Sequence, residues 1–505
     1  MVSVVYSAGL DGLLGYVVSV EADVSDGLPG MELVGYLGSE VKEARERVRM
    51  ALRNSGCPIP QRRITVNLSP ANVRKSGTGF DLAMAIGILK AINLIGDDET
   101  KDSIFLGELT LLGELSRING VLPLVLGAKN AGFKKCFLPI KNANEGAVVE
   151  EIEVYGANNL TEVISHLIGV TRIPICKNIN ENLSNSNLPA ENDLKYVQGQ
   201  PFARRGLEIA AAGMHNILLV GPPGAGKSML SKCIPSILPP LSIDECLEVS
   251  SIYSIAGKLS DQNSLITKRP FISPHHSVTD SALAGGGAKP KAGLIALAHK
   301  GVLFLDEMPE FKRSSLELLR QPLEDRQIMI SRTGGNYTYP AHFMLVGAMN
   351  PCPCGNYPDR NLCHCTDAMR DKYLSKISGP LLDRIDVCIV ARKVSPTDLL
   401  NKKEEESSET VRNRVILARE IQKERFKGTG ISFNSQMNNA QIEKYCVLGN
   451  NESSLLTELA TKHDISARSY FRILRLSRTI ADLGGEEIIN EKHLLEALRL
   501  KLNYR

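Results

Sequence analysis

A glycine-rich segment that follows a short apolar run is the feature that most constrains the fold of this chain. Residues 217–220 (Ile-Leu-Leu-Val) predict a buried strand, and residues 229–234 can begin a helix. Between them lie Gly221, Pro222, Pro223, Gly224, Ala225, Gly226, Lys227 and Ser228. Glycines let backbone N–H groups turn toward phosphates, Lys227 supplies charge to the β- and γ-phosphates, and Ser228 is a Mg²⁺ ligand. The strand–loop–helix order therefore predicts a nucleoside triphosphate site.

A second apolar run ends in two carboxylates. Residues 301–305 (Gly-Val-Leu-Phe-Leu) are followed by Asp306 and Glu307. Beside a phosphate loop, such a strand end predicts that Asp306 holds Mg²⁺, usually through water, and that Glu307 orients and polarises the water that attacks the γ-phosphate. Acidic strand ends are common, so the prediction depends on the phosphate loop in the same domain. Together the two features predict an ATPase.

Three further polar residues are expected at the nucleotide. The strand predicted over residues 342–349 ends at Asn350, which is placed to sense the γ-phosphate or to hold the attacking water. Arg384 follows a short helix and can reach a neighbouring subunit's nucleotide, as arginine fingers do; an ordinary salt bridge is the alternative. Arg468 opens a later helix, where a lid arginine could touch the γ-phosphate in cis.

Length and composition indicate a multidomain protein of the cytoplasm. A chain of 505 residues is too long for one core and predicts roughly two to four domains. The net charge of +3 neither favours nor excludes a polyanionic partner. No apolar run is long enough to span a membrane, and the N-terminus does not resemble a signal peptide. Eleven cysteines in such a chain indicate free thiols or a metal site in a reducing compartment rather than disulfides.

The periodicity of apolar residues divides the chain into four parts. Residues 1–170 predict an α+β domain, with strands at 2–6, 16–24 and 62–68 and helices at 39–54 and 80–94. Residues 171–199, rich in Asn, Ser and Glu, predict a linker. Residues 200–395 predict an α/β nucleotide-binding core with a parallel sheet, and residues 396–505 predict a helical lid over the nucleotide.

Part of the first domain resembles the Lon-protease-like domain. The resemblance rests on residues 67–82, which contain the sequence Lys-Ser-Gly-Thr-Gly-Phe-Asp-Leu, followed by Gly-Glu-Leu at 107–109 and Gly-Val-Leu-Pro at 120–123. In that family a serine nucleophile is activated by a lysine on a later helix. Here Gly79 occupies the serine position, and no lysine falls at the expected place. Acyl chemistry needs both groups, so we expect a scaffold, a module that faces nucleic acid, or a purely structural domain.

The remaining motifs resemble those of AAA+ ATPases of the magnesium-chelatase type, and within that group the ComM/YifB family of competence-associated proteins. The residues that carry this resemblance are Gly199-Gln200, residues 210–216, Pro274-His275-His276, Gly285-Gly286-Gly287, residues 297–307, residues 350–355 and residues 378–386. The resemblance implies a hexameric ring in which Lys227, Asp306, Glu307, Asn350, Arg384 and Arg468 take the roles given above. It also implies ATP-driven branch migration or helicase action on DNA during recombination or natural transformation.

Four cysteines lie close together between Asn350 and Arg384. Cys352 and Cys354 are followed after eight residues by Cys363 and Cys365. Four thiolates suit tetrahedral Zn²⁺, although Cys-x-Cys is a less common spacing than Cys-x-x-Cys. The cluster therefore predicts a zinc site, with free cytosolic thiols as the alternative.

Residues 326–339 predict a β-hairpin with a Gly-Gly turn. In related ring helicases a hairpin at this point enters the central pore. Arg332 could meet a phosphate and Tyr337 could stack on a base. The alternative is a packing hairpin whose tyrosines fill a gap.

Three other functions fit some of these motifs. A chelatase motor that drives metal insertion into a tetrapyrrole would share the ATPase core, but its motor subunit is not expected to carry a Lon-like domain. An ATP-dependent protease is disfavoured by Gly79. A protein-remodelling AAA+ ATPase remains compatible with the nucleotide motifs. We therefore expect a homohexameric AAA+ motor with ATP, Mg²⁺ and DNA as its ligands.

Overall fold

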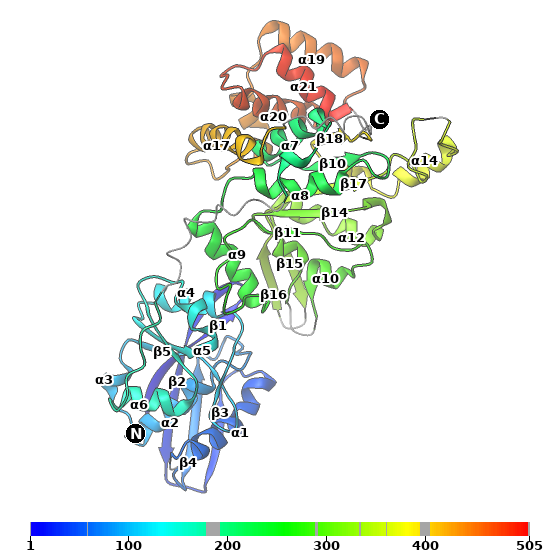
Figure 1. The fold of residues 1–505 in the computed structure, drawn as a ribbon. Coiled ribbons are helices and arrows are strands. Elements are labelled where there is room, and N and C mark those ends of the chain that lie inside the picture. The colour runs from blue at the N-terminus through cyan, green and yellow to red at the C-terminus, as the bar shows by residue number, and fades with distance from the viewer. Residues whose placement is uncertain are drawn as a thin grey trace. The chain divides into compact units, whose positions relative to one another are not determined.

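The computed structural model describes residues 2–57, 59–177, 192–287, 291–332, 335–359, 361–393 and 405–502. The chain forms two compact units (Figure 1). Unit 1 comprises Met1–Ser186, Ile243–Thr267 and Thr333–Tyr339, and unit 2 comprises Asn187–Ser242, Lys268–Arg332 and Pro340–Arg505. Residues 178–191, which belong to the predicted linker, and residues 394–404 lie outside the described residues.

Unit 1 is built on a mixed seven-stranded sheet of order β3-β4-β2-β1-β5-β8-β9. Its strands are β1 (Ser3–Asp11), β2 (Leu14–Ser25), β3 (Gly30–Val34), β4 (Arg63–Ser69), β5 (Ser103–Phe105), β8 (Lys135–Pro139) and β9 (Glu153–Ala157). β2 is antiparallel to β1 and β4, whereas β5, β8 and β9 run parallel. Burial alternates along β4, as expected for a strand with one face on the core. A small sheet pairs β6 (Glu108–Leu109) with β7 (Leu115–Ser116).

The helices of unit 1 lie around this sheet. They are α1 (Ser39–Asn54), α2 (Asp81–Ala91), α3 (Asp97–Thr100), α4 (Val121–Asn130), α5 (Ile140–Gly146), α6 (Leu160–Leu167) and α9 (Ile243–Ile255), which packs on α4. α1 buries one stripe of residues, Val41, Ala44, Val48, Ala51 and Leu52, and has charged residues elsewhere. α2 is buried on nearly every face, which agrees with its almost continuous apolar sequence.

The segment Ile243–Thr267 belongs to unit 1 although it lies between two elements of the nucleotide-binding core in the sequence. The Gly120 N–H donates to the Ser254 carbonyl at 3.1 Å. Arg117 forms an ion pair with Asp261 at 3.1 Å. The buried carboxylate of Glu145 accepts a hydrogen bond from the Ser254 hydroxyl. These contacts attach α9 and the loop after it to α4 and α5.

Unit 2 contains a five-stranded sheet of order β11-β14-β17-β10-β18, in which every neighbouring pair is parallel. The strands are β11 (Phe271–Ile272), β14 (Val302–Leu305), β17 (Met344–Met349), β10 (Ile217–Val220) and β18 (Val387–Val390). β14 and β17 are buried throughout, which explains their continuous apolar sequences. Because the strands are parallel, residues that follow them meet at one edge of the sheet.

Helices and short strands surround this sheet. The helices of the core are α7 (Pro201–Gly213), α8 (Lys227–Ile237), α10 (Asp280–Ala284), α11 (Leu294–Leu297), α12 (Arg313–Glu317), α13 (Arg320–Asp325), α14 (Asp367–Leu374) and α15 (Gly379–Leu382). The helices of the lid are α17 (Ser408–Arg425), α18 (Asn439–Tyr445), α19 (Asn450–Lys462), α20 (Ala467–Leu483) and α21 (Glu491–Leu502). In unit 2, β12 (Gly285–Gly286) pairs with β13 (Lys291–Ala292). β15 (Gln327–Arg332) pairs with β16 (Gly335–Pro340), most of which is assigned to unit 1. The described residues also form short 3-10 helices at Leu194–Tyr196, Met308–Glu310 and Asn434–Gln436.

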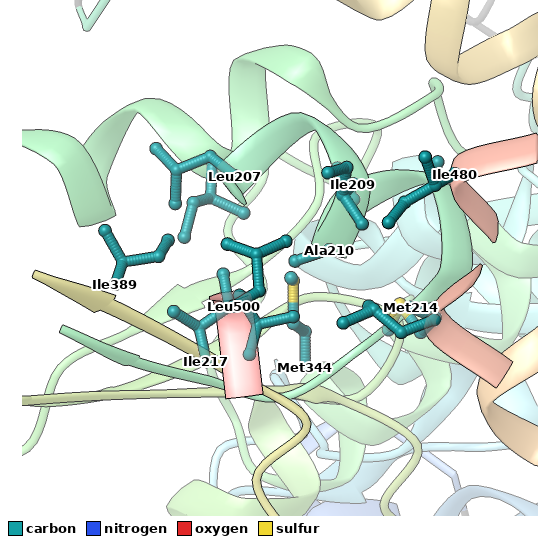
Figure 2. Close-up of a cluster of buried hydrophobic side chains, with 14 of the residues drawn as sticks. Leu207, Ile209, Ala210, Met214, Ile217, Met344, Ile389, Ile480 and Leu500 are labelled. Atoms are coloured by element: carbon teal, nitrogen blue, oxygen red, sulfur yellow. The ribbon is translucent and has the colours of Figure 1, made fainter. Parts of the chain in front are cut away.

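The core of unit 2 is shared by the sheet, α7 and the lid. Figure 2 shows Leu207 and Ala210 of α7 beside Ile217 and Met344 of the sheet, with Leu500 of α21 in the same cluster. The lid is therefore packed on the core through apolar side chains, in addition to being joined to it by the chain.

The predicted fold class is confirmed: unit 1 is mixed α and β, unit 2 contains a parallel sheet, and the C-terminal region is helical. Most elements lie within a few residues of their predicted bounds. The helix predicted over residues 80–94 ends at Ala91, and the strand predicted over 2–6 continues to Asp11 as one arm of a hairpin with β2. Among the described residues, no helix combines the length and apolar character needed to cross a membrane.

Candidate nucleotide site and the residues around it

The phosphate loop lies at the carboxyl end of β10, directly before α8. Gly224 and Gly226 have φ angles of +78° and +79°, and a Cβ atom at either position would meet nothing within 4 Å. The backbone therefore takes a left-handed conformation that favours glycine, and the space beside it is open. This open, glycine-lined turn before a helix fits the phosphates of a nucleotide.

Lys227 points back over the loop that precedes it. Its Nζ donates to the carbonyls of Gly221 at 2.6 Å and Pro222 at 3.0 Å, and to Oδ1 of Asn350 at 3.1 Å. Burial lowers the pKa of Lys227, while Asp306 and Glu307 act in the opposite direction. The ammonium group is thus held at the loop by neutral oxygens, which a phosphate can replace.

Ser228 and Asp306 meet although they come from different elements. The Ser228 hydroxyl donates to Oδ2 of Asp306 at 2.8 Å, and Oδ1 of Asp306 accepts the N–H of Glu307 at 3.0 Å. Asp306 follows β14 and Asn350 follows β17, which lies between β14 and β10 in the sheet. A hydroxyl and a carboxylate in contact are suitable oxygen ligands for Mg²⁺.

Glu307 is exposed and lies next to a histidine that the sequence did not assign to the nucleotide site. It has a φ angle of +49°, and its Oε2 lies 3.9 Å from Nδ1 of His276. The signal that could have indicated His276 is its place four residues after the end of β11, which neighbours the Asp306 strand.

Gln200 also contacts the loop. Its side-chain amide donates to the carbonyl of Ala225 at 3.3 Å and to that of Arg392, which follows β18. Gln200 is buried and immediately precedes α7. It connects the loop with the adjacent edge of the sheet.

Arg384 lies at the opposite end of the sheet from the phosphate loop. Its carbonyl accepts a hydrogen bond from Nδ2 of Asn216 at 2.8 Å, and Asn216 immediately precedes β10. Its guanidinium donates to the carbonyl of Pro380 at 2.6 Å and forms an ion pair with Glu324 of α13. A four-residue strand is roughly 13 Å long, so the backbone of Arg384 is separated from its own loop by the length of β10.

Arg468 lies beside Arg384. Its Nη1 is 3.6 Å from Oδ2 of Asp383, the residue before Arg384, and 75% of its side chain is exposed. One turn further along α20, Nε of Arg472 lies 3.6 Å from Oδ1 of Asp386. The start of α20 is therefore placed next to α15 and the amino end of β18. This geometry does not match the expectation that Arg468 reaches the nucleotide in cis.

The four cysteines form one cluster. The Sγ of Cys352 lies 3.3 Å from that of Cys354 and 3.7 Å from that of Cys363, and the Sγ atoms of Cys354 and Cys363 are 3.6 Å apart. All four Sγ atoms, including that of Cys365, lie within 4.8 Å of one another. Tetrahedral Zn²⁺ with bonds of about 2.3 Å places its sulfur ligands about 3.8 Å apart. The donor set and its spacing therefore fit zinc.

The structure describes only some of the side chains of the predicted hairpin. Arg332 ends β15, and its side chain lies outside the described residues. Tyr337 lies in β16 and is half-buried, whereas its neighbour Tyr339 is fully buried. At least one tyrosine of the hairpin therefore fills a gap, as the packing alternative predicts.

The serine position of the Lon-like motif is Gly79, which lies just before α2. Its carbonyl accepts the N–H of Gly107 at 2.9 Å. Nearby, Lys75 is fully buried and donates to the carbonyls of Val73, at 3.0 Å, and Pro70. The hydroxyl of Thr78 hydrogen-bonds to Glu108. Lys75 and Thr78 therefore each have a hydrogen-bond partner within this segment or on Glu108. Gly79 itself offers no nucleophile.

A parallel sheet with a phosphate loop, an acidic strand end and a helical lid defines a P-loop ATPase of the AAA+ class. Three family profiles match the chain: "Magnesium chelatase, subunit ChlI" over residues 193–399, "Subunit ChlI of Mg-chelatase" over residues 20–142, and "Magnesium chelatase, subunit ChlI C-terminal" over residues 405–501. Within this class, the chain belongs to the ComM/YifB family of magnesium-chelatase-like AAA+ proteins. Membership implies an ATPase that uses ATP and Mg²⁺.

Relatives that match this chain over nearly their whole length support the family assignment. The competence protein ComM of Haemophilus influenzae is 42% identical over 501 residues, which cover 98% of this chain and 96% of ComM. The uncharacterized protein YifB of Escherichia coli K12 is 39% identical over 498 residues, which cover 98% and 96% of the two chains. The Lon protease of Finegoldia magna is 26% identical over 166 residues, 30% of this chain and 21% of that protein.

Proposed function

We propose that this chain hydrolyses ATP at the edge of the sheet where the phosphate loop, Asp306 and Asn350 meet. The observation that carries the proposal is the 2.8 Å contact between Ser228 and Asp306, combined with the 3.1 Å contact between Lys227 and Asn350. Bound ATP-Mg²⁺ would supply the phosphoryl group and the metal charge. Ser228 and Asp306 would hold the metal, residues 221–228 would hold the phosphates, and Glu307 would accept the proton of the attacking water.

We propose that Arg384 and Arg468 both serve the nucleotide of a neighbouring subunit. Arg384 precedes its strand, whereas Asp306 and Asn350 follow theirs, so the arginine and the phosphate loop occupy opposite ends of a parallel sheet. Arg468 is paired with Asp383 at the same end. An arginine that cannot reach its own loop can stabilise transition-state charge across a subunit interface. This arrangement supports a closed homo-oligomeric ring, for which we propose six subunits.

We propose DNA as the polymer on which the ring acts, with branch migration during recombination or natural transformation as its task. The support is the family, one of whose members is named a competence protein. Arg332 and Tyr337 of the hairpin are the proposed DNA contacts, through phosphate and base stacking. The Lon-like domain would serve as a non-proteolytic scaffold, and the cytoplasm is the proposed location.

The decisive measurement is the rate of ATP hydrolysis with and without single-stranded and four-way-junction DNA, followed by migration of a labelled junction. We expect DNA to stimulate hydrolysis, Tyr337→Ala to weaken the stimulation, and Tyr196→Ala, which removes an exposed tyrosine elsewhere, to leave it unchanged. Hydrolysis that is indifferent to every DNA tested would contradict the DNA motor and leave the ATPase intact.

A chelatase motor is the second candidate, because the matching profiles describe magnesium-chelatase subunits. It would drive Mg²⁺ insertion into a tetrapyrrole together with partner subunits. ATP-dependent insertion measured by porphyrin fluorescence would favour it. A protein-remodelling ATPase would instead show stimulation by unfolded polypeptide.

For the four-cysteine cluster we propose one Zn²⁺ ion, bound by Cys352, Cys354, Cys363 and Cys365. The sulfur spacing supports this assignment. Metal analysis of the full chain purified without chelator should give close to one equivalent of zinc. A content below one tenth of an equivalent would contradict it.

A further inference from the structure

The four-cysteine loop reaches the phosphate loop through Gly355. This glycine follows Cys354, and a Cβ atom on it would lie 2.5 Å from Cδ and 2.9 Å from Cγ of Pro223. Such distances are shorter than any normal carbon–carbon contact, so the backbone of Gly355 packs directly on the Pro223 ring. Because a proline ring cannot rotate away, the position of this turn and the position of the phosphate loop depend on each other.

The same turn approaches Asn350. A Cβ on Gly355 would lie 3.7 Å from Cγ of Asn350, whose Oδ1 accepts a hydrogen bond from Lys227. After the cysteines, α14 returns to this point, and its buried Tyr373 lies near the backbone of Asn350. One short segment thus contacts the loop that would hold the phosphates and the side chain that would sense them.

Cysteines lie on both sides of Gly355 in the sequence. Cys352 and Cys354 precede it, and the Gly355 N–H donates to the Cys352 carbonyl at 3.0 Å. Gly355 has a φ angle of +82°, a conformation that other residues adopt only with strain. Cys363, nine residues after Cys354, brings the far end of the loop back to the same cluster at 3.6 Å. A cation bound to all four thiolates would fix both ends and hold Gly355 against Pro223.

We propose that the metal-bound cysteine loop is a positioning element for the nucleotide site: it holds Pro223 and Asn350 in place through Gly355, so that nucleotide affinity depends on the metal. This inference rests on the proposed zinc and ATP sites. Gly355 is a positioning residue, because it has no side chain that could bind nucleotide or metal and its backbone acts through Pro223.

The test uses the full-length protein and measures two quantities for each variant, the zinc content and the equilibrium Kd of a fluorescent ADP analogue with Mg²⁺. Cys363→Ser should lose zinc, and its Kd should rise. Gly355→Ala should keep about one equivalent of zinc but bind nucleotide roughly 5- to 100-fold more weakly. The added methyl group displaces the Pro223 ring, and this change should cost as much binding free energy as overpacking costs in a protein core.

Matched controls separate these effects from general damage. Gly428→Ala places the same methyl group at a φ angle of +75° with nothing within 4 Å, and should leave both quantities unchanged. Cys57→Ser removes a cysteine of unit 1 and should do the same. Should Cys363→Ser fail to fold, the wild-type chain stripped with a strong chelator and reloaded with Zn²⁺ replaces it: Kd should rise on stripping and return on reloading.

The coupling is overturned if zinc-free protein, or Gly355→Ala with its zinc retained, binds the nucleotide with the wild-type Kd. Wild-type protein that binds no nucleotide would contradict the proposed ATPase instead. Wild-type protein that lacks zinc as purified, and whose Kd does not change on adding Zn²⁺, would overturn the role of the metal. None of these readouts requires DNA, so the outcome does not depend on the DNA-motor proposal.

Discussion

The hydroxyl oxygen of Ser228 lies 2.8 Å from Oδ2 of Asp306, although one residue begins α8 and the other follows β14. The contact arises because β14, β17 and β10 are neighbours in a parallel sheet, so their carboxyl ends lie at the same edge. The hydroxyl and the carboxylate are thus held next to each other, and their remaining lone pairs can bind one cation. This relationship is the structural basis for the proposed Mg²⁺ site.

Asp306→Asn should weaken Mg²⁺ binding while preserving the shape of the site. The amide can still contact Ser228, but it lacks the charge that a divalent cation requires. We expect the Mg²⁺ concentration for half-maximal ATP hydrolysis to increase by about tenfold or more, corresponding to about 1.4 kcal/mol. Titration of Mg²⁺ at saturating ATP measures this. An unchanged Mg²⁺ requirement would remove Asp306 from the metal site.

Glu307→Gln should leave nucleotide binding intact and abolish turnover. Glu307 is exposed, and its carboxylate lies beside His276, so the change should not alter nucleotide affinity. Removal of a general base, in contrast, costs about 100- to 10,000-fold in rate. Glu310→Gln is the matched control, because Glu310 lies nearby on the surface and pairs with Lys376 at 3.0 Å. Full hydrolysis by Glu307→Gln would show that another group activates the water.

The sequence was sufficient to predict the nucleotide edge of the sheet but not the positions that depend on packing between distant segments. Gly221–Ser228, Asp306 and Asn350 each adjoin an apolar run, and parallel strands bring such positions together. The contact of Gly355 with Pro223 and that of His276 with Glu307 leave no periodic pattern, because each depends on how two loops fold over the sheet.

The position of Arg384 could have been predicted from the sequence, whereas that of Arg468 could not. Arg384 precedes the apolar residues Val387–Val390, so it belongs to the amino edge of a parallel sheet. The placement of Arg468 depends on the lid, whose orientation is set by buried contacts such as the 2.9 Å pair between His215 and Thr479. Likewise, no local pattern indicates that Ile243–Thr267 belongs to unit 1.

Asp81→Asn should change how the stability of unit 1 depends on pH. Burial raises the pKa of Asp81 to about 6 from 3.8, although hydrogen bonds and charge from Arg47 oppose the shift. A carboxyl that binds its proton more tightly in the folded state stabilises the fold below pH 3.8, and this contribution is lost as the pH rises through 6. The shift corresponds to roughly 3 kcal/mol.

We therefore expect the difference in stability between wild type and Asp81→Asn to vary between pH 4 and pH 6.5 and to be constant above. Hydrogen exchange of the α2 amides at several pH values follows unit 1 within the whole chain. Asp98→Asn changes an exposed aspartate, so its stability should depend on pH in the same way as that of the wild type. A constant difference for Asp81→Asn would show that the carboxyl has the same proton affinity folded and unfolded.

Leu207→Ala should destabilise unit 2. Leu207 is fully buried where α7 packs on the sheet and the lid (Figure 2), so truncation leaves a cavity. Such substitutions cost about 2–5 kcal/mol. Urea unfolding followed by circular dichroism should show a transition at lower denaturant for this variant. Leu417→Ala, which truncates a leucine that is 62% exposed on α17, should leave the transition unchanged.

Mixing two inactive variants should restore ATP hydrolysis if Arg384 acts on a neighbouring subunit. Arg384→Ala keeps its own phosphate loop and Glu307 but supplies no arginine, while Glu307→Gln supplies the arginine and cannot activate water. An interface with the intact arginine of one subunit and the intact glutamate of the other contains every proposed group. Loss of such an arginine costs about 1,000-fold or more in rate, so even a minority of repaired interfaces is measurable above the separate variants.

The same mixture distinguishes a role of Arg384 at a neighbouring subunit's nucleotide from a role within its own subunit. An arginine that serves only its own nucleotide, or only its ion pair with Glu324, gives no recovery on mixing, because every subunit then lacks one essential group. Subunit exchange is verified with a labelled wild-type chain, which should enter the mixed assemblies. Mixing Arg384→Ala with Lys227→Ala provides a second pair. The Lys227→Ala subunit still has Arg384, which can complete the ATP site of an adjacent Arg384→Ala subunit, whose Lys227 is intact. Recovery in both pairs requires that the phosphate loop of one subunit and Arg384 of the next complete one site.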